Sequence, residues 1–286
     1  MAPIDPCFGP GVSTIAVPLS HADETASPRV HRMWAAGRDE RIAAGYRDEA
    51  ERFVSRLRLQ AGERVLDAAC GSGTATLPAA RAGAEVTGVD LVASALHTAG
   101  TRAAGEELAP RLERASVESL PYPDASFDVV LSLFGVMFAA RPDRVLAELA
   151  RVTRPGGRMA LASWSPGGFM GALHGLLTGP IPITFDVPDP LRWGDANAVR
   201  EWLDGEWEVR TETRVATLRY PHTAAGTAEL FRTAYPPAVR AFEMLGEDNR
   251  AVLAGELAGL WIRSRRSGTA RTEVEAEYLE VVATRR

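Results

Sequence analysis

Lysine is absent from this chain of 286 residues, so its 32 basic residues are all arginines. A lysine general base and Schiff-base chemistry are therefore excluded. The formal net charge is −5, which leaves no positive footprint for a nucleic acid, and we expect no nucleic-acid partner. The densest basic cluster, Arg263, Arg265 and Arg266, is interpreted as the solvated end of a helix.

Cysteine and long apolar runs are also scarce. Cys7 and Cys70 cannot form a disulfide framework, and no paired metal-ligand spacing occurs, so no metal site is expected. No apolar run reaches the about 18 residues of a membrane span, and we expect no membrane partner. Residues 1–28 lack the basic start of a signal peptide and are interrupted by prolines. We interpret them as a mobile arm and expect a cytoplasmic protein.

A turn of small residues is the most informative feature that the sequence does contain. The apolar strand at 64–68 runs into a turn of small residues at 69–74, and a second apolar strand ends on Asp90, 17 residues after Gly73. Glycines let the backbone approach a ligand closely. A carboxylate at the end of the second strand can accept both hydroxyls of a ribose. This pattern indicates a nucleotide-type cofactor site.

The residues around the turn decide between cofactor classes. Thr76 stands where a dinucleotide site has its third glycine, which lets the helix pack closely and the pyrophosphate rest at its N-terminus. Asp67, at the end of the first strand, would place a negative charge beside a diphosphate. The same charge favours a ligand with an ammonium group and a sulfonium. The pattern therefore favours S-adenosylmethionine over NAD.

Three further segments complete a resemblance to a known family. They are SVESLPY at 116–122, FDVVLS at 127–132 and RVTRPGGR at 151–158. With the two motifs above, they make the chain resemble a class I S-adenosylmethionine-dependent methyltransferase of the small-molecule type over about residues 31–286. Two positions depart from the family pattern. Ala69 replaces a glycine, and Ser116 replaces an acid that accepts a hydrogen bond from adenine, for which serine is a weaker acceptor.

Motifs and resemblance together predict the cofactor contacts. The expected cofactor is S-adenosyl-L-methionine, and the expected binding residues are Asp67, Ala69, Cys70, Gly71, Gly73, Asp90, Leu91, Ser116, Val117, Glu118 and Ser132.

Strands and helices alternate along the chain, which predicts an α/β fold. The expected strands are 64–68, 85–90, 112–116, 127–133, 158–164, 207–220 and 275–284; the expected helices between them are 76–82, 93–104 and 142–151. The resemblance implies a Rossmann-like, seven-stranded, mostly parallel sheet with helices on both faces and an antiparallel last strand. We expect one methyltransferase domain over 29–286. A helix at 31–57 and a helical insert at 221–270, with helices near 227–244 and 250–265, are expected to form a lid.

Aromatic and histidine side chains are the candidates for the acceptor side. We expect Trp34, Phe134, Met137, Phe138, Trp164, Phe231 and Tyr235 to contact the substrate, with core packing an equal alternative for Met137. A base is needed only if the acceptor must lose a proton. His174 is the candidate base and His31 a second one, while structural roles remain open for both. His97 is expected to lie away from the reacting methyl group.

The leading function is methyl transfer to a small acceptor, hydrophobic or aromatic, of the kind made in natural-product biosynthesis. One alternative is a methyltransferase-fold enzyme that keeps the cofactor as a structural element and catalyses a cyclisation. Another is a non-catalytic cofactor-binding subunit. Both a monomer and a homodimer remain open. The scarcity of bases favours an acceptor that brings its own acidity, such as a phenol or an enol.

Overall fold

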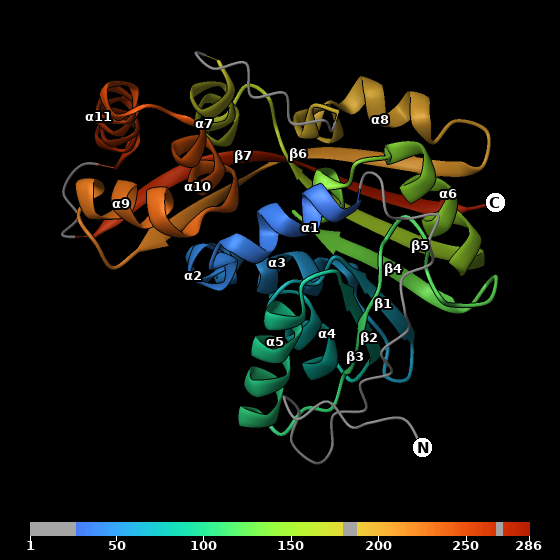
Figure 1. The fold of residues 1–286 in the computed structure, drawn as a ribbon. Coiled ribbons are helices and arrows are strands. Elements are labelled where there is room, and N and C mark those ends of the chain that lie inside the picture. Colours follow the sequence, from blue (N-terminus) through green and yellow to red (C-terminus); the bar gives the residue numbers. More distant parts are fainter. Residues whose placement is uncertain (1–26, 180–187, 267–270) are drawn as a thin grey trace.

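Seven strands form one mixed sheet in the computed structural model, which describes residues 27–179, 188–266 and 271–286 (Figure 1). The spatial order is β3-β2-β1-β4-β5-β7-β6. The strands are β1 (Arg64–Ala68), β2 (Glu85–Asp90), β3 (Arg111–Arg114), β4 (Phe127–Leu133), β5 (Thr153–Trp164), β6 (Trp207–Tyr220) and β7 (Thr272–Arg285). The first five are parallel, and β7 lies antiparallel between β5 and β6. The predicted fold class is confirmed.

Helices cover both faces and one end of this sheet (Figure 1). They are α1 (Ser27–Ala36), α2 (Asp39–Ala43), η2 (Ala44–Tyr46), α3 (Arg47–Leu57), α4 (Thr76–Arg81), α5 (Ala93–Gly105), η3 (Val136–Phe138), α6 (Pro142–Val152), α7 (Phe169–Thr178), η4 (Pro190–Gly194), α8 (Ala196–Trp202), α9 (Ala224–Ala234), α10 (Pro236–Met244) and α11 (Glu247–Ser264). In the described part of the chain, no helix is long and apolar enough to span a bilayer.

The central strands are buried because their sequences are nearly continuous apolar runs, as expected for parallel strands covered on both faces. In β1, every residue after Arg64 is buried. Asp128 lies near the start of β4, and its carboxylate binds the guanidinium groups of Arg64 and Arg154. These contacts lower the pKa of Asp128. Asp128 therefore ties the amino-terminal edge of the sheet together, at the opposite end from the glycine turn.

The N-terminal segment differs from the single helix predicted at 31–57. The structure divides it into α1, α2, η2 and α3. Around Gly37 the chain leaves the helix, and the N–H of Arg38 donates to the carbonyl of Ala234. A Cβ on Gly37 would lie 2.5 Å from Cγ of Pro236. The segment breaks because its glycines let it approach the α9–α10 region closely, and the apolar periodicity does not report this contact.

Several other bounds shift by a few residues. β5 begins at Thr153 and not at 158, because Thr153 pairs with Phe127 before the register shifts over the following residues. β3 ends at Arg114, since Ser116 turns back in a bridge with Ser119. The predicted arm 1–28 lies outside the described residues up to position 26, and α1 already begins at Ser27. Positions 267–270 of the predicted insert also lie outside them.

The three helices between β6 and β7 gather at one end of this strand pair, at the left of Figure 1. α1 packs against α10, while α2 packs against α9 and α5. The N-terminal segment therefore lies between the insert and the carboxyl ends of the first strands. This arrangement encloses a cavity over the glycine turn.

Candidate functional site

The glycine turn connects β1 to α4 in a left-handed backbone. Ala69, Gly71 and Gly73 have φ values of 58°, 54° and 78°. Glycine adopts this conformation at little cost, whereas Ala69 is strained. A Cβ on Gly73 would lie 2.7 Å from Cδ1 of Leu77 and 3.1 Å from Cβ of Ala99, so a larger residue would crowd α4 and α5. Gly73 therefore lies on the side of the turn that packs against the helices and not on the side that faces the cavity.

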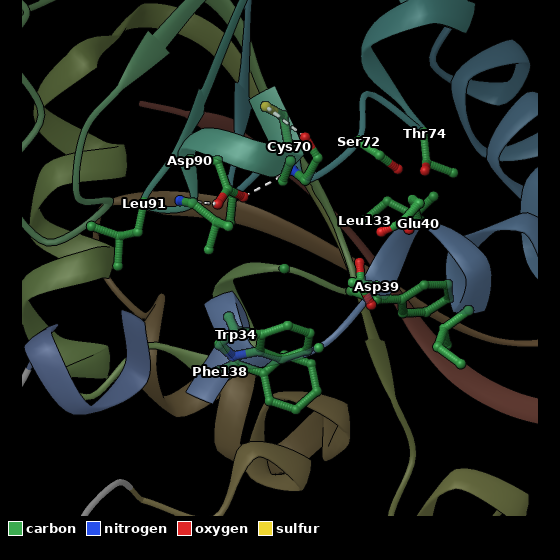
Figure 2. A pocket seen from close by; sticks show the side chains of 18 of the residues that line it. Trp34, Asp39, Glu40, Cys70, Ser72, Thr74, Asp90, Leu91, Leu133 and Phe138 are labelled. Carbon is green, nitrogen blue, oxygen red and sulfur yellow. Dashed lines mark hydrogen bonds between the residues drawn. The ribbon is translucent and has the colours of Figure 1, made fainter. Parts of the chain in front are cut away.

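Asp90 fixes the turn from the neighbouring strand. Its Oδ2 accepts a hydrogen bond from the N–H of Gly71 at 2.8 Å, and its Oδ1 accepts one from the N–H of Val92 at 2.9 Å (Figure 2). Burial raises the pKa of this carboxyl group, against the backbone hydrogen bonds that lower it. Each carboxylate oxygen can accept a further hydrogen bond, and Asp90 borders the cavity.

Asp67 is buried beneath the turn, with 1% of its surface exposed. Thr76 donates its hydroxyl to Oδ2 of Asp67 at 2.6 Å. Thr76, which stands where a dinucleotide site has its third glycine, therefore holds the Asp67 carboxylate in place. Burial raises the pKa of Asp67 to about 7, and the charge of Asp90 acts in the same direction.

The segment after β3 borders the cavity through Ser116, Val117 and Glu118. The hydroxyl oxygen of Ser116 accepts the N–H of Glu118 at 3.2 Å. The Glu118 carboxylate is paired with the guanidinium of Arg141 at 2.7 Å. This part of the cavity is therefore less negative than the part beside Asp67 and Asp90.

All of these segments open onto one cavity of about 390 Å³. Of the predicted cofactor residues, Asp67, Ala69, Cys70, Gly71, Asp90, Leu91, Ser116, Val117 and Glu118 line it. Gly73 and Ser132 do not. Ser132 is buried, donates its hydroxyl to the carbonyl of Ala68 and accepts the N–H of Val136. It joins β4 to β1 behind the cavity wall.

Aromatic side chains line the rest of the cavity. Phe134 stacks on Trp164 with 3.6 Å between ring centroids, and Tyr46 meets both rings edge-on. Trp34 lies against Phe138, with 4.7 Å between centroids (Figure 2). The predicted acceptor residues that line the cavity are Trp34, Phe134, Phe138, Trp164, Phe231 and Tyr235. Met137 is 2% exposed and packs in the core, away from the lining.

The two histidine candidates lie in different places. His174, on α7, is not part of the lining, and its Nε2 lies 3.6 Å from Oδ1 of Asp189. The geometry therefore gives no support to His174 as the base. His31 does line the cavity. Burial, followed by the charges of Arg114 and Arg32, lowers the pKa of His31, so its imidazole is neutral at pH 7.

Several lining residues belong to no sequence motif and were not predicted, among them the polar side chains of Asp39, Glu40, Tyr46 and Tyr220. Asp39 and Glu40 open α2 directly after the break at Gly37. Acids are enriched in the first turn of helices, and this enrichment is a local signal that could have pointed to a helix start at Asp39. Tyr220 ends β6, and its hydroxyl donates to the carbonyl of Ile42 at 2.8 Å.

The lining of the cavity holds more acidic than basic side chains, although Arg38 is part of it. Asp39, Glu40, Asp67 and Asp90 line the cavity, and within the described ranges none of them forms an ion pair. Within the part of the chain that the structure describes, no three metal-ligating side chains come together as a possible metal site. Such a cavity favours a ligand that is itself cationic. S-adenosylmethionine, with an ammonium and a sulfonium group, fits this charge, whereas a diphosphate would be repelled.

Known proteins that are similar to this chain include methyltransferases. The family model described as a methyltransferase domain matches residues 66–161. An uncharacterized protein from Mycobacterium tuberculosis is 32% identical over 283 residues, covering 96% of this chain and 100% of the relative. The 27-O-demethylrifamycin SV methyltransferase of Amycolatopsis mediterranei is 34% identical over 202 residues, covering 69% of this chain and 68% of the relative.

Solved structures share the fold. The YcgJ protein from Bacillus subtilis has a TM-score of 0.58 at 16% identity, covering 84% of this chain and 98% of that one. A geranyl diphosphate methyltransferase in complex with S-adenosylmethionine has a TM-score of 0.51 at 19% identity, covering 84% and 85%. The chain therefore belongs to the class I S-adenosylmethionine-dependent methyltransferases and uses S-adenosylmethionine as its cofactor.

Proposed function

We propose that this enzyme methylates a small hydrophobic or aromatic metabolite. The observation that carries the proposal is the continuity of one cavity from the glycine turn to the aromatic residues. A donor at the turn and an acceptor among the rings would share this space without intervening solvent. Alignment of two bound reactants supplies about 7–11 kcal/mol in well-oriented reactions.

The proposed cofactor contacts follow the strand order. Asp90 accepts the ribose hydroxyls, because its two oxygens have acceptor capacity left beside Gly71 and Val92. Ser116 and Val117, on the β3 side, flank the adenine. The backbone of the turn at Ala69 and Gly71 supports the amino-acid half. Bound S-adenosylmethionine supplies an electrophilic methyl group on a sulfonium, which aromatic faces attract.

The proposed acceptor wall comprises Trp34, Phe134, Phe138, Trp164, Phe231 and Tyr235. α1 and the helices α9–α11 act as its lid, because the break at Gly37 brings the N-terminal segment against Ala234. Six aromatic rings favour an apolar, flat acceptor. His31 is the proposed proton acceptor because it lines the cavity, and an acidic phenol or enol would need little help from it.

Natural-product biosynthesis is the proposed setting. The support is the similarity to a rifamycin methyltransferase, whose match covers about two thirds of both chains. A cytoplasmic location is also part of the proposal.

The test is turnover of candidate acceptors with a donor labelled in its methyl group. Phenolic and enolic metabolites should acquire the label while S-adenosylhomocysteine accumulates in equal amount. Amines and simple sugars serve as comparison acceptors. Formation of a rearranged product without S-adenosylhomocysteine would support cyclisation with a retained cofactor. Tight donor binding without transfer to any small molecule would point to a non-catalytic subunit.

A further inference from the structure

We propose that the Asp39 carboxylate, delivered by α2, binds the ammonium group of S-adenosylmethionine. This assignment rests on the proposed placement of the cofactor and deepens it. It adds a binding residue that lies outside the glycine turn and outside the acids that end the strands.

Asp39 reaches the cofactor turn from the opposite side of the cavity. A Cβ placed on Gly71 would lie 3.7 Å from Oδ2 of Asp39. The carboxylate therefore faces the same backbone that Asp90 holds. Figure 2 draws Asp39 and Glu40 beside Leu133, Ser72 and Thr74, while Leu91 lies at the other end.

That position corresponds to one end of the cofactor. The carboxyl ends of β3, β2, β1 and β4 follow one another across the sheet. With adenine beside Ser116 at β3 and ribose at Asp90 at β2, the amino-acid half extends over β1 and toward Leu133 at the end of β4. Asp39 lies on this side, so its nearest cationic partner is the ammonium and not the adenine.

The Asp39 carboxylate has no partner among the residues that the structure describes. Asp39 forms no hydrogen bond or ion pair through its side chain within the described residues. Its titratable neighbours are Glu40 on α2, Asp90 on β2, Tyr46 on η2, Tyr220 on β6 and Tyr235 at the start of α10. None of these is a cation. Arg38 precedes Asp39 in the chain and lines the same cavity, but no ion pair joins the two. A half-buried acid that is surrounded by other acids is costly, and this cost is relieved when a cation binds.

Binding of three nucleoside ligands separates the ammonium from the rest of the cofactor. S-adenosylmethionine and S-adenosylhomocysteine carry the ammonium; 5′-methylthioadenosine keeps the adenosine and the thioether but lacks the amino acid. Asp39→Asn should weaken the first two by about tenfold or more, as expected for the loss of a charged hydrogen bond. The Asp39→Asn variant should bind methylthioadenosine as tightly as the wild type does, or more tightly.

Asp48→Asn is the matched control, because Asp48 is an exposed acid paired with Arg219 on the surface. Asp39→Glu keeps the charge and should retain the preference for ligands with an ammonium. Three results with Asp39→Asn would each overturn the assignment: equally weakened binding of all three ligands, weakened binding of S-adenosylmethionine alone, or unchanged binding of all three. So would an Asp39→Glu variant that loses the preference as fully as Asp39→Asn. These outcomes do not depend on the acceptor, whose methylation tests the proposed function separately.

Discussion

Asp90 has two tasks that one substitution removes together. It accepts the N–H groups of Gly71 and Val92, and in the proposed complex it also accepts the ribose hydroxyls. Asp90→Ala should weaken S-adenosylmethionine binding by about 1.5–3 kcal/mol or more, because hydrogen bonds to a charged group are lost. Calorimetric titration measures this, with the exposed Asp204→Ala as control. Unchanged affinity would show that the ribose lies elsewhere.

Ala69 holds a strained backbone that glycine would relieve. Its φ of 58° lies in the left-handed region, where an L-residue pays about 1–2 kcal/mol. Glycine loses more conformational entropy on folding, so Ala69→Gly should raise the free energy of unfolding by about 0.5–1 kcal/mol. Denaturant titration tests this. Ala251→Gly, at an exposed position inside α11, should have the opposite sign. Destabilisation by Ala69→Gly would mean that its methyl group packs usefully.

The sequence could bring residues to the cavity where each of them follows its own strand. Asp67, Asp90 and Ser116 sit at or just after strand ends, so a correct reading of β1, β2 and β3 brings them to one edge. Asp39 and Tyr220 escape such reasoning, because they come together only when the N-terminal segment packs against β6 and α9. Whether a side chain faces the cavity also depends on contacts between segments that are distant in the sequence.

At the scale of elements, Gly45 controls how the N-terminal segment docks on β6. A Cβ there would lie 2.2 Å from the Tyr220 ring, whose hydroxyl binds the carbonyl of Ile42. Gly45→Ala should destabilise the protein by about 1–3 kcal/mol through overpacking. Hydrogen exchange should accelerate over 39–57, and cofactor affinity should fall with it. Gly167→Ala, where a Cβ meets open space, is the control. Unchanged exchange in this segment would contradict the docking role.

Elements were predictable to the extent that their pattern is local. The apolar runs of β1, β2, β4 and β6 are uninterrupted or regular, and their predicted bounds agree with the structure. The prediction of one helix at 31–57 was wrong, because the breaks in this segment are caused by contacts with residues about 200 positions away. The early start of β5 failed for a related reason: its first pairing, with Phe127, spans a register shift that no propensity marks.

At the scale of the molecule, the acidic cavity should make stability depend on pH. Burial raises the pKa of Asp39 and of Asp67 to about 7 from an ordinary 3.8. The folded state therefore binds more protons than the unfolded state between these values, and stability falls as the pH rises through about 7. His31 and His174 have lowered pKa values, so their contribution ends near 6.5, below this window.

Thermal unfolding between pH 6.5 and 8 measures the effect. The ligand-free protein should unfold at a lower temperature at pH 8. Saturating S-adenosylmethionine should reduce the difference, because a cation favours both carboxylates. Asp39→Asn should reduce it without ligand. A midpoint that rises toward pH 8 in the ligand-free protein would contradict the charge assignment.

The division of the cavity between segments of the chain has an evolutionary consequence. Residues 64–164 supply the turn, the strand-end acids and part of the aromatic wall, while Trp34, Tyr46, Tyr220, Phe231 and Tyr235 come from the flanking segments. Mutations in those flanking segments can alter which metabolite is accepted while the chemistry of the donor is inherited unchanged. Asp39 is the exception, since it comes from a flanking segment yet faces Gly71. Diversification of the N-terminal segment should therefore be freer at Trp34 and Tyr46 than at Asp39.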